Sequence, residues 1–131
     1  MQQALEGVDA DIAAWERRLA AGEPVELGRA LDAAIAAASA LLRAYVAAEG
    51  AKPVPPADAD LLEAFKVLVK GDPTWNAIRD TLRELVYYRN CLALGRADAL
   101  PAVPEKMAIR LARHVYLYMR TRCIKEGRVA P

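Results

Sequence analysis

Three polar residues in the second half of this chain could carry out chemistry: Arg89, Asn90 and His114. Arg89 follows an apolar run that repeats every three or four residues, as one face of a helix does: Trp75, Ile78, Leu82, Leu85 and Val86. A guanidinium stays charged, so on an apolar face it needs a carboxylate, a cluster of carbonyls, a partner chain or a phosphate. We therefore expect Arg89, with Asn90 beside it, to be either an interface or anion-binding group or a helix-end cation held for structure.

His114 is the single histidine of the chain. An imidazole titrates near neutral pH and could act as a general base, although a histidine at the edge of a core is more often bonded to a carbonyl. Together with Cys91 and Cys123 it would make three metal ligands, but the short Cys-Cys or His-His spacings of metal sites are missing. We expect no metal and no cofactor. Glycine-rich phosphate loops, Gly-x-Ser-x-Gly turns and paired carboxylates on one helix face are also missing, which disfavours nucleotide and serine-type hydrolysis.

Basic residues gather towards the C-terminus. Residues 1–88 contain 9 Lys and Arg against 14 Asp and Glu, whereas residues 89–131 contain 9 against 3. This asymmetry indicates either a surface for nucleic acid or an acidic partner, or attraction between the two ends within the fold or across a dimer. In the last helix the basic residues lie opposite the apolar arc, with only Glu105 to balance them. The candidate binding residues are Arg89, Tyr87, Tyr88, Lys106, Arg110, Arg113 and Arg120.

Five helices are expected to position these side chains. They span residues 2–20, 24–49, 60–70, 73–94 and 105–126, and glycines or prolines separate them. Asp58 is expected to cap the third helix, and Asp72-Pro73 to begin the fourth. The second helix is small or apolar on most sides, which is typical of a central helix. We predict an all-α protein, a single bundle of four to five mostly up-and-down helices over residues 1–131, with its core at about residues 4–127.

Composition agrees with a soluble helical domain. Hydrophobic residues make up 55% of the chain, but many are alanine, and there are one Phe and five Tyr. This mix favours helices packed through small side chains over a β-sandwich. No stretch approaches about 18 uninterrupted apolar residues and the N-terminus does not look like a signal peptide, so we expect no membrane span. Two cysteines fit a reduced, cytoplasmic protein.

The segment Leu85-Val86-Tyr87-Tyr88-Arg89-Asn90 resembles the HEPN superfamily of small helical bundles. In that family an Arg, often followed by Asn, is followed after four to six residues by His. The corresponding positions here are Leu94, Gly95 and Arg96, so the family's histidine is absent. The resemblance covers roughly residues 25–127. It implies the bundle architecture, dimerisation through the helix that bears Arg89, and binding of RNA, nucleotides or a protein. Active members cleave RNA without metal, but the missing histidine removes the usual base, and His114 is too distant in sequence to fill the motif.

Three functions are consistent with these features. The first is a non-catalytic interaction module, homodimeric or bound to a protein partner or a polyanion. The second is a HEPN-like metal-independent ribonuclease or toxin component that uses Arg89 and Asn90, with His114 as a displaced base. The third is a nucleic-acid-binding accessory subunit that uses the basic last helix. We favour the first, because the catalytic set is incomplete.

Overall fold

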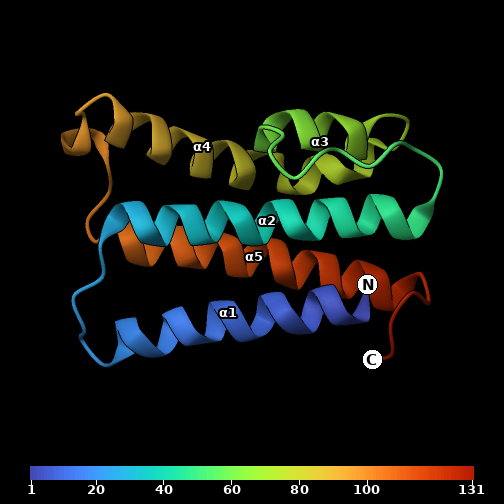
Figure 1. The fold of residues 1–131 in the computed structure, drawn as a ribbon, viewed down its shortest axis with the longest axis horizontal. Helices are drawn as coiled ribbons and strands as arrows, with labels where there is room; N and C mark the ends of the chain where they lie inside the picture. Colours follow the sequence, from blue (N-terminus) through green and yellow to red (C-terminus); the bar gives the residue numbers. More distant parts are fainter.

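The chain folds into five α-helices without β-strands, in a computed structural model that describes residues 1–131 (Figure 1). This arrangement confirms the all-α bundle predicted from the sequence. The five helices are α1 (Gln2–Ala20), α2 (Leu27–Glu49), α3 (Leu61–Val69), α4 (Arg79–Ala93) and α5 (Pro104–Lys125). Two short 3₁₀ helices, η1 (Pro73–Ile78) and η2 (Ala97–Ala99), lie on either side of α4 in the chain.

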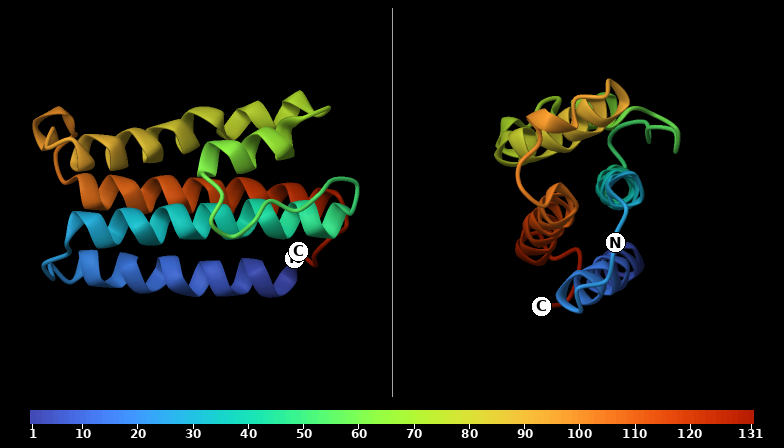
Figure 2. Two further views of the ribbon diagram at one scale, coloured as in Figure 1. Left: turned by 45° about the horizontal axis from the view of Figure 1, so that its top comes forward. Right: turned by 90° about the vertical axis from the view of Figure 1, so that its left-hand side faces the viewer.

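Helices α2 and α5 run side by side through the middle of the bundle (Figures 1 and 2). Helix α1 packs against both of them on one side, and α3 with α4 covers the other side. The loop after α2 returns along that helix before α3 begins, so α3 and α2 run in the same direction (Figure 1). Helix α5, which contains most of the basic residues of the C-terminal part, is thereby packed against α1 and α2 of the acidic first half.

Helix α2 supplies the largest part of the core and contacts every other α-helix. Its buried residues recur at helical spacing: Ala30, Leu31, Ala34, Ala37, Ala38, Leu41, Leu42, Tyr45 and Val46. The central position expected for this helix is therefore found. One side of it nevertheless stays exposed, at Ala36, Ala40 and Ala47, and Figure 2 shows no other helix beyond that side.

Helix α2 is also long and apolar enough to cross a membrane, judged by length and composition alone. In the bundle, 44% of its most apolar stretch of 18 residues is buried. The core helix of a soluble protein meets the same two criteria, so they do not assign α2 to a membrane.

The starts of three helices differ from the sequence prediction. Helix α2 begins at Leu27 rather than near Pro24. Asp60, not Asp58, caps α3, since its carboxylate accepts a hydrogen bond from the Leu62 amide. The fourth predicted helix is divided into η1 and α4. In a 3₁₀ turn, residues three apart point the same way, which directs both Trp75 and Ile78 into the core.

Candidate functional site

Arg89 lies in a groove of about 270 Å³ between α2, the start of α3 and α4. Its Nη2 is 3.2 Å from Oδ1 of Asp60, and its side chain is 39% exposed. The other oxygen of Asp60 accepts the Leu62 amide at 3.3 Å and so caps α3. Arg89 therefore lies half-exposed at the edge of the core rather than inside it, and it ties α4 to the first turn of α3. A carboxylate of the same chain, rather than a free anion site, neutralises it.

The three candidate catalytic residues do not meet within one chain. Asn90 is exposed on α4, and His114 is exposed on α5. The groove around Arg89 is lined by α2, residues 57–61 and α4, without a residue from α5. His114 makes no side-chain hydrogen bond or ion pair, so no hydrogen-bonded chain leads from it to Arg89. An acid–base pair of the ribonuclease type would need a second chain or a large movement.

The two tyrosines before Arg89 differ in accessibility. Tyr88 is 2% exposed, and its hydroxyl donates a hydrogen bond of 2.9 Å to Glu84. Burial and the Glu84 carboxylate together raise the pKa of Tyr88 to about 12. Tyr87 is 51% exposed and lies next to Tyr88, with the ring centroids 6.3 Å apart. Of the pair, only Tyr87 can contact a partner.

Arg113 is neutralised by α1. Its guanidinium lies 2.6 Å from Asp9 and 2.7 Å from Glu16, and its side chain is 20% exposed. It also lies over the ring of Tyr116, 5.0 Å from the centroid. The expectation that Glu105 alone would balance the basic arc of α5 is therefore wrong for Arg113. The acids that balance it are on α1, about a hundred positions earlier in the chain, and the sequence pattern of α5 does not reveal them.

The remaining basic residues of α5 form an exposed surface, which we call the cationic face. It consists of Lys106, Arg110, Arg120 and Lys125, together with the exposed side chains of His114, Leu117 and Thr121. None of its four cations forms an ion pair. Leu117 lies among them with 52% of its surface exposed. Lys106 and Arg110 also line a small hollow against the end of α1.

Arg122 is a further enclosed cation, and the sequence pattern did not single it out. Its side chain is 15% exposed, and its guanidinium lies 3.8 Å from the centroid of the Trp75 ring. It forms ion pairs of 2.5 Å with Asp72 and 3.0 Å with Glu126, and donates a hydrogen bond of 2.8 Å to Thr74. Arg122 thus links η1 to α5. Arg122 lies beside the apolar arc of α5, which indicates a partly enclosed side chain. The pattern Asp72-Pro73 indicates only the start of a helix, and it does not identify Asp72 as the partner of Arg122.

Tyr45, Glu126 and Arg128 extend this cluster towards α2. The Tyr45 hydroxyl donates a hydrogen bond of 2.6 Å to Glu126, which also pairs with Arg128 at 2.9 Å. The Tyr45 ring meets Trp75 edge to face, with centroids 4.7 Å apart. All buried polar side-chain atoms of the protein have a hydrogen-bond partner. The cluster is therefore a satisfied structural network, which stabilises the end of the bundle where the chain terminates.

The network sets the pKa values of its acids. The hydrogen bond from Thr74 lowers the pKa of Asp72, and Arg122 lowers it further against the opposing effect of burial. Burial alone would raise the pKa of Glu126, but hydrogen bonds from Tyr45, Arg128 and Arg122 bring it below the ordinary value. Burial also opposes the charge of Arg122, whose pKa is nevertheless raised by its neighbours, chiefly Tyr118 and Asp72. Both acids and the arginine are charged at neutral pH.

The structure contains no group of three or more His, Cys, Asp or Glu side chains that could hold a metal ion. Cys91 and Cys123 are both buried and unpaired. Burial raises the pKa of the Cys123 thiol, which disfavours the reactive thiolate.

Fold and site together define the chain as a five-helix bundle with an exposed cationic helix. Among the proteins compared with it, no family model, curated protein or solved structure matches the chain. The resemblance to HEPN domains is therefore not tested by these comparisons and stays a prediction from residues 85–90.

We predict that Arg122→Met destabilises the protein by about 2 kcal/mol, because it leaves Asp72 without a cation, removes one of the two cations paired with Glu126, and removes the contact with the Trp75 ring. Arg120→Met, two positions away on the exposed side, is the matched control and should change stability by less than about 0.5 kcal/mol. Urea denaturation followed by circular dichroism measures both. Equal stabilities of the two variants would contradict the structural role of Arg122.

Stability should also fall in acid. Asp72 and Glu126 have lower pKa values in the folded state, so their contribution is present above the unfolded values and is lost as the pH falls through the folded ones. The free energy of unfolding should therefore decrease between about pH 5 and pH 2. The variant with both Asp72→Asn and Glu126→Gln should be less stable at neutral pH and show a shallower acid dependence. The same dependence in both proteins would refute this assignment.

Proposed function

We propose that the chain is a non-catalytic interaction module that binds an acidic protein surface through the cationic face of α5. The observation that carries this proposal is the division of the basic residues into two groups. Arg89, Arg113 and Arg122 are neutralised by acids from the first half of the chain. Lys106, Arg110, Arg120 and Lys125 have no ion-pair partner and surround an exposed leucine.

The dimensions of the cationic face suit an extended or helical segment of a partner. Lys106 and Lys125 are nineteen positions apart, which is about 28 Å along a helix. Such a row of cations attracts acidic surfaces and speeds their encounter. Leu117, near the middle, adds an apolar contact that charge alone would not provide.

A protein partner is favoured over nucleic acid by the side chains that surround these cations. Single-stranded nucleic acids gain much of their affinity when bases stack on exposed aromatic rings. On α5, Tyr116 is buried, and the hydroxyl of Tyr118 is bonded to the Thr74 carbonyl at 3.2 Å. The exposed apolar residue of the cationic face is Leu117, which packs against aliphatic side chains of a protein but offers no stacking surface.

The proposal is tested with two acidic peptide probes, one carrying leucines on one helical face and one composed only of glutamate. Replacing Lys106, Arg110 and Arg120 by Gln should weaken binding of both peptides at least about tenfold at low salt and flatten the salt dependence. Leu117→Ala should weaken binding of the leucine-bearing peptide alone. Isothermal titration calorimetry measures these affinities.

The control replaces three exposed cations that also lack ion pairs but lie on other helices or loops: Arg17, Lys70 and Arg83, each changed to Gln. This variant has the same net charge as the first and should keep wild-type affinity. Equal loss in both triple variants would show a diffuse charge effect and refute the proposal. Tighter binding of a single-stranded RNA that does not depend on Leu117 would favour the nucleic-acid alternative, and cleavage of that RNA in EDTA would favour the ribonuclease.

A further inference from the structure

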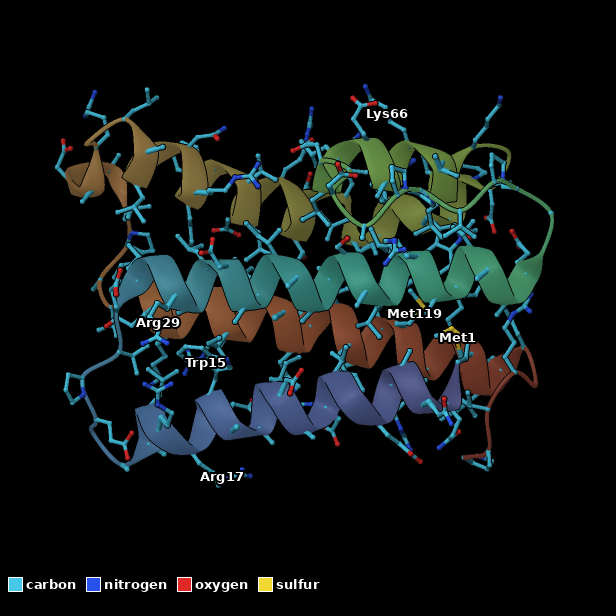
Figure 3. All side chains as sticks on the ribbon, viewed as in Figure 1. Met1, Trp15, Arg17, Arg29, Lys66 and Met119 are labelled. Atoms are coloured by element: carbon cyan, nitrogen blue, oxygen red, sulfur yellow. The ribbon has the colours of Figure 1, made fainter.

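The exposed side of α2 is bordered by two grooves and carries few large side chains. Ala36 and Ala40 form its middle, and both line the groove towards α3 and α4 as well as a second groove towards α1. The second groove has a volume of about 420 Å³ and, apart from Asp11, is lined by apolar side chains. Figure 3 shows Trp15 pointing from α1 towards α2 at the end of this groove where Arg29 lies. We call this exposed side of α2, from Asp32 to Arg43, the ridge. An α-helix could approach α2 closely at Ala36 and Ala40, because only methyl groups separate the backbones there.

The charged residues on the ridge indicate which kind of partner could bind to it. Asp32 lies before the two alanines and Arg43 lies after them, on the same side of the helix. They are eleven positions apart, about 16 Å along the axis, so they cannot pair within one chain. Asp32 is exposed, and neither residue forms an ion pair, although Arg43 Nε donates a hydrogen bond of 2.9 Å to the Pro55 carbonyl.

We propose that this ridge binds a second copy of the chain, with the two α2 helices packed antiparallel about a two-fold axis between Ala36 and Ala40. In this arrangement Asp32 of each copy lies opposite Arg43 of the other, which gives two identical ion pairs around a small-residue centre. A parallel arrangement would instead place Asp32 against Asp32 and Arg43 against Arg43. The charge pattern is thus complementary to itself in one orientation only.

The antiparallel dimer also explains why the centre of the outer side of α2 consists of alanines. A surface helix normally has a charged side opposite its buried side. Here three exposed alanines, Ala36, Ala40 and Ala47, share the outer side with three charged residues, Arg29, Asp32 and Arg43, and the ridge continues into grooves on both flanks. A contact through one helix per subunit is smaller than the standard interface of about 800 Å² per partner, so the dissociation constant should be on the order of micromolar. The inference does not depend on the cationic face of α5.

Sedimentation velocity of the purified chain, between about 5 and 500 µM, tests the dimer. The wild type should show a reversible monomer–dimer equilibrium in this range. Asp32→Arg and Arg43→Asp should each weaken self-association at least about tenfold, because each places two like-charged pairs across the axis. The double variant that exchanges the two charges should dimerise again, and an equimolar mixture of the two single variants should form a heterodimer.

A bulky substitution tests the close approach. Ala36→Arg should abolish the dimer, whereas Ala10→Arg, at an exposed alanine of α1, should not. Circular dichroism melts show whether each variant is folded, since all of these positions are at least partly exposed. A wild type that stays monomeric throughout, or association that Ala36→Arg and Asp32→Arg leave unchanged, would overturn the proposal. If the wild type dimerises but the double variant with exchanged charges at positions 32 and 43 does not, the antiparallel register is overturned.

Discussion

The enclosed guanidinium of Arg122 is the interaction on which the end of this bundle depends. It lies over the Trp75 ring, 3.8 Å from the centroid, and it joins Asp72 at the start of η1 to Glu126 after the end of α5. Tyr45 of α2 then bonds to the same Glu126. Three segments distant in sequence are therefore fixed by one cation, and every polar atom buried with it has a partner. A cation in such a place is tolerated only because its charge and its hydrogen bonds are both satisfied.

The same principle explains the uneven charge of the chain. The acidic first half and the basic last part attract each other across the fold, at Arg89 with Asp60, at Arg113 with Asp9 and Glu16, and at Arg122 with Asp72. Pairing within the fold uses those cations for structure. Within α5, it leaves Lys106, Arg110, Arg120 and Lys125 unpaired, and these residues give the cationic face its charge. The distinction between structural and available cations is therefore the basis of the proposed function.

The sequence was sufficient for the architecture and insufficient for the partners of its charged residues. The spacing of apolar residues and the glycines at helix ends predicted the positions of the helices closely. The apolar composition of α2 predicted its central place in the bundle. The spacing predicted Arg89 on the apolar face of its helix, and the structure places it at the half-exposed edge of that face. Its partner Asp60 could not be predicted, because it lies twenty-nine positions earlier and joins Arg89 only through the packing of α3 on α4. Arg113 and Arg122 were misjudged or missed for the same reason. Helical periodicity reports which side a residue occupies, whereas ion pairs depend on tertiary contacts.

The central claim is that the arginines of the last helix fall into two classes, and exchange of their Nε protons with water measures this directly. In ¹⁵N-labelled protein, the Nε–H groups of Arg113 and Arg122 are bonded to Glu16 and Glu126 and should exchange slowly. Those of Arg110 and Arg120 are exposed and should exchange at the rate of free arginine. Two clearly separated classes are the predicted result. Similar fast exchange at all four would contradict the account, because no arginine of α5 would then be held by the fold.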